Sequence, residues 1–418
     1  MDYFLINGGK KLFGSVAVDS AKNALLPILA GCLLSEGIVT IKNVTYYEDI
    51  NSMLEILQLL GIKIQKHENV LVLDCRYIDK YIIPLELTNK LRASVFCLGP
   101  LLGRLGKARL AYPGGCAIGS RPIDLHISGL AKLGVHVIDR HGYITAYKGN
   151  MKAGKVCLPF PSVGATENLI MASVLNLGRT QIIGGAKEPE VVDLCNFLNA
   201  LGAKIYGAGS DHIIIDGVPS LAGGEYTVMP DRIIAGTYLM LPLLCGGEVE
   251  VINANGEHIS PLVELLKNNS CNIRVKSDRI IVTAKRRAKC FGKIETLPYP
   301  HFPTDLQQPL SCVACVAKGT TIITENLFES RFKHVPELVK MGAKINICDS
   351  SIIIDGVKEL FGAEVVAPDL RGGAALVMAG LVANGYTTVK NVNLIDRGYF
   401  ALEQKLSMLG ADIKRLKE

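Results

Sequence analysis

The sequence predicts an α/β protein of two domains, each built from three copies of one βαβαββ unit. Three observations lead to this prediction: a helix end that recurs along the chain, a short apolar strand after nearly every copy, and a motif near residue 10 that repeats one near residue 358. The 418 residues are 49% hydrophobic and 20% charged, which is typical of a globular protein of two or three domains.

The recurring element is a helix that ends in a Leu-x-x-Leu-Gly type of pattern. Its copies are spaced by 68 to 73 residues, and repetition at such a period indicates one structural unit copied several times. The glycine stands at 61, 134, 202, 342 and 410, with Ser270 in its place in a weaker copy. A short apolar strand is expected after each of the first five copies, at Val70–Asp74, Tyr143–Tyr147, His212–Asp216, Arg279–Thr283 and Ser351–Asp355.

Each unit also contains an earlier helix, which ends before a glycine that leads into another strand. Those glycines are Gly37, Gly106, Gly178, Gly247, Gly319 and Gly385. The order within a unit is therefore β-α-β-α-β-β, in which helices pack on small sheets around apolar cores.

The sixth copy has no strand after it, and the start of the chain supplies a candidate. Asn7-Gly8 and Leu12-Phe13-Gly14 match Asp355-Gly356 and Leu360-Phe361-Gly362 in type and spacing. The amino-terminal segment is therefore expected to complete the sixth unit. One domain is predicted at residues 22–229 and the other at 1–21 plus 230–418, with the ligand site in the cleft between them.

Several classes of protein are excluded by composition and charge. The longest apolar run, residues 24–34, is too short to span a bilayer, and no secretory signal opens the chain, so we expect a cytoplasmic protein with no membrane partner. The net charge of +6 is dispersed, which favours small anionic ligands over nucleic acid. Cys312-Val-Ala-Cys315 has no second ligand pair, so no metal site is predicted.

Cys116 differs from the other eleven cysteines, nearly all of which lie in apolar runs and are expected to be buried. It stands in a glycine- and proline-rich stretch with Arg121 five residues on, and a thiol in such a loop is a candidate for chemistry. From the glycine after the first helix to the glycine after the second, the unit with Cys116 spans 28 residues, against 23 to 25 in the others. This glycine-rich insertion predicts a lid.

Charged residues recur at matching offsets in the six units. The first helices are expected to start at Lys22, Arg92, Ser162, Arg232, Asp305 and Arg371, and the second helices at Asp49, Arg121, Glu188, His258, Arg331 and Arg397. A helix amino terminus favours anions, so cations repeated there indicate a bound phosphate or carboxylate. For any single residue, a solvated surface cation remains the simpler interpretation.

The motifs at these positions resemble a known family. They are Asp19-Ser-Ala-Lys22-Asn23, Arg92-Ala-Ser, Gly114-Gly-Cys116-Ala-Ile-Gly-Ser-Arg121-Pro-Ile-Asp124-Leu125, Pro161-Ser162-Val-Gly164-Ala-Thr-Glu-Asn168, Phe302-Pro-Thr-Asp305, Glu325-Asn-Leu327 and Asp396-Arg397-Gly. Over its full length the chain resembles the UDP-N-acetylglucosamine 1-carboxyvinyltransferases. These belong with 3-phosphoshikimate 1-carboxyvinyltransferase (EPSP synthase) to the enolpyruvyltransferase family, but the latter lacks this cysteine lid.

The resemblance implies a two-lobed inverse α/β barrel and a reaction without metal or cofactor. Phosphoenolpyruvate would donate its enolpyruvyl group to the 3-hydroxyl of UDP-N-acetylglucosamine and release phosphate, the first committed step of peptidoglycan synthesis and hence of cell-wall biogenesis, cell shape and cell division. The enzyme is expected to be a monomer with these two small molecules as its only substrates. The epoxide fosfomycin is expected to alkylate Cys116.

The resemblance also assigns roles to residues. Lys22, Arg121 and Arg397, with Asn23 beside them, would bind phosphoenolpyruvate. Cys116 would be the general acid and could carry a reversible enolpyruvyl adduct, and Asp305 would take the hydroxyl proton. The residues expected to hold the sugar nucleotide are Arg92, Ser120, Arg121, Pro122, Ile123, Asp124, Leu125, Ser162, Val163, Gly164, Asp305 and Leu327.

Some assignments have alternatives. Taken without the resemblance, Asp305 is best interpreted as an ordinary helix N-cap. Arg331 and Arg371 fit either positioning of the substrate site or ion pairs between lobes. Phe160 stands where some relatives have a lysine near the diphosphate, so the diphosphate charge would be met differently here. Ile234 stands where others have an acid after the pair Asp231-Arg232.

Other functions remain open at this point. Cys116 with His126 could form a cysteine hydrolase or acyltransferase, although no third group that orients the histidine can be named. The acceptor could be another molecule, such as shikimate 3-phosphate. A duplicated copy could also bind UDP-sugar and regulate without catalysis, but the presence together of Lys22, Cys116, Arg121, Asp305 and Arg397 argues against this.

Overall fold

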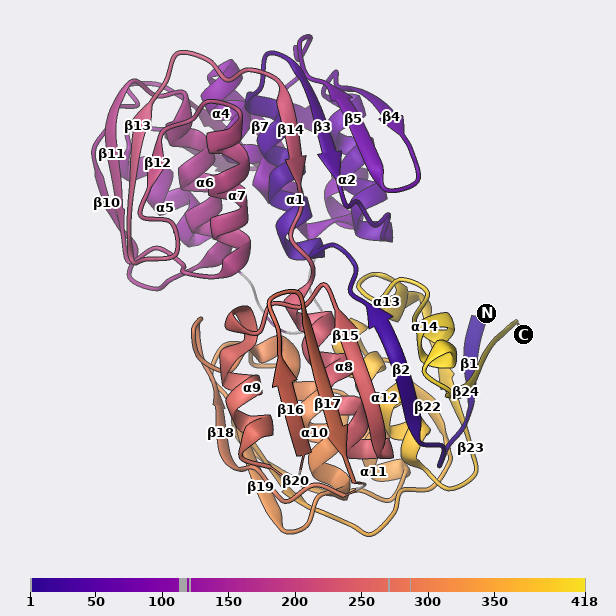
Figure 1. Ribbon diagram of the computed structural model, residues 1–418. Coiled ribbons are helices and arrows are strands. Elements are labelled where there is room, and N and C mark those ends of the chain that lie inside the picture. Colours follow the sequence, from indigo (N-terminus) through magenta and orange to yellow (C-terminus); the bar gives the residue numbers. More distant parts are fainter. Residues whose placement is uncertain (1, 113–118, 120–121, 270, 286, 418) are drawn as a thin grey trace. The chain divides into compact units, whose positions relative to one another are not determined.

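The computed structural model describes residues 2–112, 119, 122–269, 271–285 and 287–417 (Figure 1). They form two compact units, which are described separately. Unit 1 contains the chain up to Asp19 and again from Pro230 onward. Unit 2 contains residues Ser20 to Met229 outside the loop at 113–121.

Unit 2 contains three four-stranded sheets, with strand orders β14-β3-β5-β4, β6-β7-β9-β8 and β10-β11-β13-β12. In each sheet the first pair of strands is parallel and the other pairs are antiparallel. The strands are β3 (Ile38–Lys42), β4 (Lys63–Lys66), β5 (Val70–Asp74), β6 (Ile82–Ile83), β7 (Lys107–Ala111), β8 (His136–Arg140), β9 (Tyr143–Tyr147), β10 (Lys155–Cys157), β11 (Gly178–Ile183), β12 (Ile205–Tyr206), β13 (His212–Gly217) and β14 (Gly224–Thr227).

The helices of unit 2 follow the predicted order of one helix after the first strand and one after the second, with short extra turns. They are α1 (Lys22–Gly31), η1 (Cys32–Leu34), α2 (Glu48–Leu59), α3 (Leu85–Lys90), η2 (Arg92–Cys97), α4 (Leu98–Leu105), α5 (Asp124–Lys132), α6 (Val163–Val174) and α7 (Pro189–Ala200).

Unit 1 repeats this plan with sheets β16-β17-β15-β2, β18-β19-β21-β20 and β22-β23-β1-β24. Its strands are β1 (Asp2–Asn7), β2 (Leu12–Ala17), β15 (Gly247–Ile252), β16 (Cys271–Val275), β17 (Arg279–Ala284), β18 (Gly292–Thr296), β19 (Thr320–Glu325), β20 (Lys344–Cys348), β21 (Ser351–Asp355), β22 (Glu364–Val366), β23 (Tyr386–Lys390) and β24 (Asp412–Lys417). Its helices are α8 (Arg232–Cys245), η3 (Glu257–Ile259), α9 (Ser260–Lys267), η4 (Thr304–Leu306), α10 (Gln307–Val316), α11 (Val335–Lys340), α12 (Leu370–Val382), α13 (Asn393–Asp396) and α14 (Leu402–Met408).

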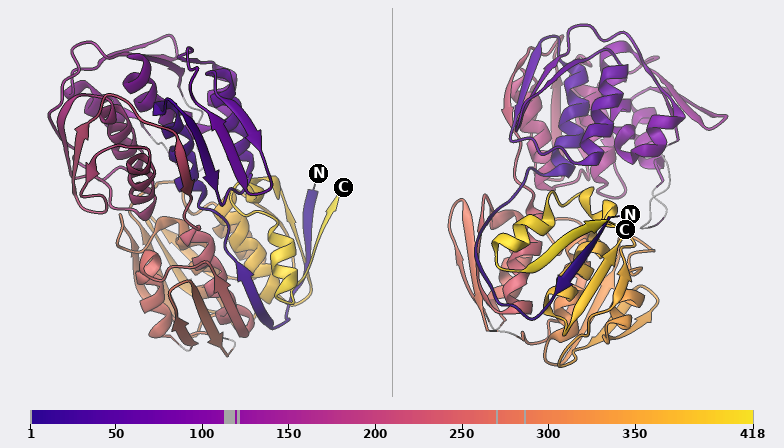
Figure 2. Two further views of the ribbon diagram at one scale, coloured as in Figure 1. Left: turned by 45° about the horizontal axis from the view of Figure 1, so that its top comes forward. Right: turned by 90° about the vertical axis from the view of Figure 1, so that its right-hand side faces the viewer.

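The first helix of each repeat lies inside its unit. In unit 1, every residue of α10 is buried, and so is almost every residue of α8 and α12. The second helices, such as α2 and α9, bury one face only. A helix that is apolar all round requires a core position, whereas an amphipathic helix covers a surface. Within each unit the sheets therefore surround central helices, which is the predicted inverse α/β barrel (Figure 2).

The amino-terminal strand completes the sixth repeat, as its sequence match predicts. β1 lies between β23 and β24 and is antiparallel to both. In its register with β24, Asp2 is opposite Lys417 and Asn7 is opposite Asp412. The two ends of the described chain therefore lie side by side in one sheet (Figure 2).

The first strands of two repeats are exchanged, which the sequence did not predict. β2 precedes α1 in the chain but pairs in parallel with β15 of the fourth repeat. β14 precedes α8 but pairs in parallel with β3 of the first repeat. The three sheets of unit 2 are therefore completed by β14 from the end of its segment of chain, and those of unit 1 by β2 from the amino-terminal segment.

Gly356, just after β21, permits a close approach of two backbone segments. A Cβ built there would lie 1.7 Å from the carbonyl oxygen of Ala317 and 2.7 Å from its carbon. Gly356→Ala must therefore displace backbone, and we expect it to lower the free energy of unfolding by about 1 to 3 kcal/mol. Gly154→Ala is the control, because a Cβ there meets nothing within 4 Å. Urea unfolding of both variants tests this, and equal stabilities would contradict it.

The burial of the cysteines differs in part from the prediction. Seven of those outside the Cys116 loop are buried as expected, but Cys157 and Cys348 are exposed, and Cys271 and Cys290 are intermediate. Cys157 and Cys348 lie on strands whose alternation turns these side chains away from the core. Within the described residues, no helix combines the length and apolar character needed to cross a membrane.

Candidate active site

In unit 2, Lys22 forms a buried ion pair with Asp49. Lys22 is the first residue of α1, and its Nζ lies 3.0 Å from Asp49 Oδ2 in the first turn of α2. Both side chains are only 8% exposed. Asn23, the next residue, is exposed. The cation is thus held at the start of a helix by a carboxylate of the chain, so its position does not itself require a bound anion.

Asn168 on α6 joins three other elements of unit 2. Its Oδ1 accepts a hydrogen bond from the Gly99 N–H at 2.8 Å, and its Nδ2 donates to the Val95 carbonyl at 3.0 Å. Nδ2 also lies 2.8 Å from Nδ1 of the buried His126. These contacts fix η2, α4, α5 and α6 relative to one another, and those elements carry most of the residues predicted to bind the sugar nucleotide.

The same contacts bear on the cysteine-hydrolase alternative. Because Nδ2 of Asn168 is a donor, Nδ1 of His126 accepts, and a neutral His126 carries its proton on Nε2. The sequence named no group that orients His126, and Asn168 is that group. It selects the tautomer in which Nε2 cannot take a proton from a thiol, which argues against His126 as the base.

The start of α6 has the predicted conformation for a helix amino terminus. Ser162 is the N-cap, and its hydroxyl accepts a hydrogen bond from the Ala165 N–H at 3.4 Å. A Cβ at Gly164 would lie 3.1 Å from His126 Cε1 and 3.4 Å from Phe96 Cε1, so only glycine fits without displacement. The other predicted binding residues described here are Arg92 at the start of η2, Val163, and Pro122, Ile123, Asp124 and Leu125 at the start of α5.

In unit 1, Asp305 lies between two buried arginines. Its Oδ2 accepts hydrogen bonds from Arg371 Nε at 3.2 Å and Nη2 at 3.1 Å, and its Oδ1 accepts one from Arg331 Nη2. Arg331 and Arg371 are 3% and 2% exposed, while Asp305 is 25% exposed. The N-cap residues of η4 and α10 are Pro303 and Leu306, and Asp305 lies inside η4, so the interpretation of Asp305 as a helix N-cap is wrong. Both arginines form an ion pair with this carboxylate, which also belongs to unit 1.

A chain of hydrogen bonds leads from this cluster to Leu327. Arg331 Nε donates to Thr304 Oγ1 at 3.2 Å, and the Thr304 hydroxyl donates to Glu325 Oε2 at 2.8 Å. Oε1 of Glu325 then accepts from the backbone N–H groups of Leu327 and Phe328, at 2.9 and 3.2 Å. These hydrogen bonds therefore fix the position of the turn after β19 relative to Asp305.

Two arginines are not at helix starts, contrary to the prediction. Arg331 lies in a turn four residues before α11, and Arg397 is the C-cap of α13, five residues before α14. The offsets matched because the loops have similar lengths, although helical structure begins later in these copies. Lys22, Arg232 and Arg371 do stand in the first turns of their helices.

Two side chains near Arg331 contain buried polar atoms for which the described residues supply no hydrogen-bond partner. These atoms are Asp369 Oδ2 and His334 Nδ1. Asp369 caps α12 through its other oxygen, which accepts from the N–H groups of Arg371 and Gly372. Burial lowers the pKa of His334 to about 4, so this imidazole is neutral near pH 7. Its Nε2 lies 2.8 Å from Ser311 Oγ.

The predicted residues Cys116, Ser120 and Arg121 lie outside the described residues, and so does the predicted lid. Among the residues that are described, no group of three or more histidine, cysteine or acidic side chains is placed to hold a metal ion. The sequence missed Asn168, Thr304 and Glu325 as organising residues. Asn168 and Glu325 belong to the motifs quoted above, but their spacing in the sequence did not indicate their hydrogen-bond partners.

Comparison with known proteins agrees with this fold. The family model described as EPSP synthase (3-phosphoshikimate 1-carboxyvinyltransferase) matches residues 6–406. The chain belongs to this family.

Curated relatives have names that describe a narrower class of protein than the family model does. The chain is 47% identical over 416 residues to "UDP-N-acetylglucosamine 1-carboxyvinyltransferase 2" of Caldanaerobacter subterraneus subsp. tengcongensis, with both chains fully covered. It is 44% identical over 418 residues to "UDP-N-acetylglucosamine 1-carboxyvinyltransferase" of Serratia proteamaculans, again with full coverage of both.

Solved structures share the fold at low sequence identity. The enolpyruvyl transferase NikO from Streptomyces tendae has a TM-score of 0.89 and 23% identity, and covers all of this chain and 99% of its own. An EPSP synthase from Acinetobacter baumannii has a TM-score of 0.75 and 18% identity, with full coverage of both chains.

Proposed function

We propose that this chain transfers the enolpyruvyl group of phosphoenolpyruvate to the 3-hydroxyl of UDP-N-acetylglucosamine and releases phosphate. The observation that carries the proposal is the full-length identity of 42 to 48% with relatives named for this reaction. The Asp305 cluster, Lys22 and the start of α6 support it, because residues with assigned roles stand in ordered, hydrogen-bonded positions.

The reaction has two steps. The 3-hydroxyl adds to C2 of phosphoenolpyruvate while C3 takes a proton, and the resulting tetrahedral intermediate then loses phosphate and a C3 proton. The proposal assigns the cations Lys22, Arg121 and Arg397 to the anionic groups of phosphoenolpyruvate, and Cys116 to proton delivery at C3. It requires groups of both units to act on the same pair of substrates.

Asp305 must lose one of its two arginine partners before it can accept the proton of the 3-hydroxyl. Guanidinium groups at both oxygens favour the ionised carboxylate, so a carboxylate held in this way is a weak base. We therefore propose that an anionic group of the substrates draws one arginine from Asp305. The freed oxygen then becomes the proton acceptor.

The cellular setting is part of the proposal. A UDP-sugar acceptor fits a cytoplasmic enzyme that begins peptidoglycan synthesis, and hence one that supports the cell wall, cell shape and cell division. The proposed enzyme works as a monomer without metal or cofactor, since its own cations and proton donors supply what the reaction needs.

Phosphate release tests the proposal. Purified protein with phosphoenolpyruvate should release phosphate only when UDP-N-acetylglucosamine is added, and Cys116→Ser should retain at most trace turnover. Release of phosphate with shikimate 3-phosphate instead would contradict the proposed acceptor, and binding of UDP-N-acetylglucosamine without phosphate release would indicate the regulatory alternative.

Fosfomycin should add one covalent adduct to the protein, on Cys116. Cys157→Ser and Cys348→Ser are the controls, because these exposed thiols should not alter that adduct.

A further inference from the structure

Residues 396–399, which carry Arg397, are anchored on both sides of that arginine. At Gly398 a Cβ would lie 2.5 Å from Leu370 Cδ1, so this backbone packs directly on α12. Tyr399 is fully buried, with its hydroxyl 2.9 Å from Thr237 Oγ1 and its ring centroid 5.3 Å from the Arg371 guanidinium. These contacts anchor the carboxyl-terminal side of Arg397.

The anchor on the amino-terminal side is Arg415 of β24. Its Nη1 donates to Asp396 Oδ2 at 3.0 Å, and its Nη2 donates to Asp396 Oδ1, which is the two-pronged geometry of a strong arginine–carboxylate pair. Asp396 is the last residue of α13, directly before Arg397. The guanidinium therefore holds the peptide unit from which Arg397 extends.

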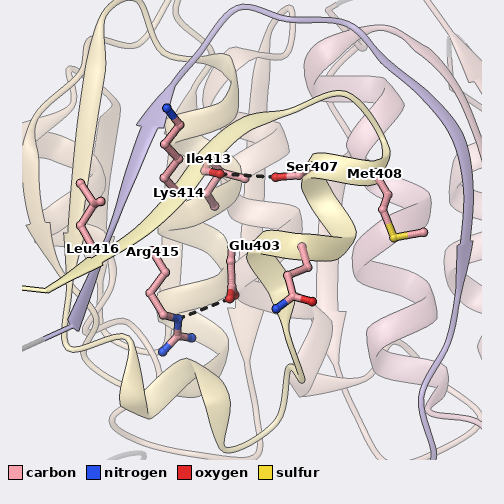
Figure 3. Close-up of a pocket in the computed structure, with 8 residues that line it drawn as sticks. Glu403, Ser407, Met408, Ile413, Lys414, Arg415 and Leu416 are labelled. Carbon is pink, nitrogen blue, oxygen red and sulfur yellow. Dashed lines mark hydrogen bonds and ion pairs between the residues drawn. The ribbon is translucent and has the colours of Figure 1, made fainter.

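Arg415 is itself fixed by three other groups. Its Nε lies 3.4 Å from Glu403 Oε1 of α14, its Nη1 lies 3.4 Å from Asp2 Oδ2 of β1, and the Phe4 ring centroid is 4.9 Å from the guanidinium carbon. Figure 3 shows Arg415 reaching Glu403 at the edge of a pocket of about 690 Å³ between α14 and β24. One cation thus balances three carboxylates, and without it they would repel one another.

We propose that Arg415 is a positioning residue for Arg397: by binding Asp396, it fixes the end of α13 so that the Arg397 side chain meets the substrate anion. This inference rests on the proposed function, in which Arg397 binds phosphoenolpyruvate. Lysine cannot replace Arg415 fully, because an ammonium group does not reproduce the planar fork that binds both oxygens of Asp396. In this proposal Arg415 affects Arg397 through Asp396, and it is 26% exposed at the outer strand of its sheet.

The test is a steady-state kinetic comparison of wild type, Arg415→Lys and Arg415→Gln. We expect the KM for phosphoenolpyruvate to rise about tenfold or more in Arg415→Gln and less in Arg415→Lys, while the KM for UDP-N-acetylglucosamine stays within about twofold. Lys414→Gln is the matched control, since it removes the same charge from the exposed neighbour on β24 and should change neither KM.

A double-mutant cycle separates positioning from a general loss of structure. In an Arg397→Ala background, Arg415→Gln should add little to the KM for phosphoenolpyruvate, because its effect passes through Arg397. A purely structural role would instead lower kcat and thermal stability with both KM values unchanged, or give additive effects, and either result would overturn the inference. If wild type is active but Arg415→Gln binds phosphoenolpyruvate normally, this inference alone fails. If wild type shows no phosphate release, the proposed function fails and the inference with it.

Discussion

Asp305→Ala is expected to lower the free energy of unfolding by about 3 kcal/mol and to reduce turnover at least about 100-fold. The substitution removes the carboxylate that neutralises Arg331 and Arg371, which are almost fully buried. Two buried guanidinium groups of unit 1 would then lose the carboxylate that they share. We take the lower end of the range for breaking a buried ion pair because Asp305 retains 25% exposure.

Two comparisons separate the stability and activity effects. Asp305→Asn keeps the shape of the side chain and one acceptor oxygen, so it should lose less stability than alanine while losing as much turnover. Glu264→Ala removes a carboxylate from an exposed ion pair with Lys267 on α9 and should cost less than about 1 kcal/mol. Urea unfolding and phosphate release measure both quantities. If Asp305→Ala is no less stable than Glu264→Ala, the cluster does not have the assigned energetic role.

Glu167→Gln is expected to stabilise the protein near neutral pH, increasingly so as pH rises. Glu167 on α6 is fully buried, and neither of its carboxyl oxygens has a hydrogen-bond partner among the residues that the structure describes. Burial, with smaller contributions from Glu190 and Glu188, raises the pKa of this carboxyl well above its usual range. Ionising it in the folded protein therefore costs free energy that glutamine avoids.

The sign of the pH dependence follows from the raised pKa. An unfolded glutamate ionises near pH ~4.3. Above that pH the folded state binds one more proton than the unfolded state, so the contribution of Glu167 to stability is present at low pH and is lost as pH rises towards the folded pKa. The advantage of Glu167→Gln should grow by up to about 1.4 kcal/mol per pH unit in this window.

Unfolding by urea at several pH values measures this difference. The advantage of Glu167→Gln should be larger at pH ~7 than at pH ~5. Glu86→Gln, at an exposed position on α3, is the control, and the difference for Glu167→Gln should change more with pH than the difference for Glu86→Gln. A constant difference for Glu167→Gln would show that this carboxyl ionises normally.

The architecture could be predicted from local patterns because each repeat carries its own. The strands at Val70–Asp74, Tyr143–Tyr147 and Ser351–Asp355 are found with the predicted bounds. The position of β1 followed from the shared Asn/Asp-Gly and Leu-Phe-Gly spacing. The sequence did not predict that β2 pairs with β15 and β14 with β3. Strand partners depend on long-range packing, and the local sequence of each strand is compatible with either partner.

The sequence predicted which charged residues belong to the candidate site, but it did not predict the partners that they have in the structure. Cations at recurrent offsets were read as ligands for anions, yet Arg331 and Arg371 bind Asp305 and Lys22 binds Asp49. Sequence spacing shows that a charge is present, whereas its partner depends on which repeats face each other inside a unit. The same limit hid Asn168, whose role exists only because Gly99, Val95 and His126 come from other elements.

The pairing of β1 with β24 has a consequence for how the gene could be rearranged. Asp2 and Lys417 are register partners, so a short linker could join the two ends of the chain. Reopening the chain between Asp19 and Ser20 would then yield a circular permutant in which unit 2 comes first and unit 1 follows without interruption. The present order, with one unit inserted in the other, is thus one of several linear orders that the same closed topology allows.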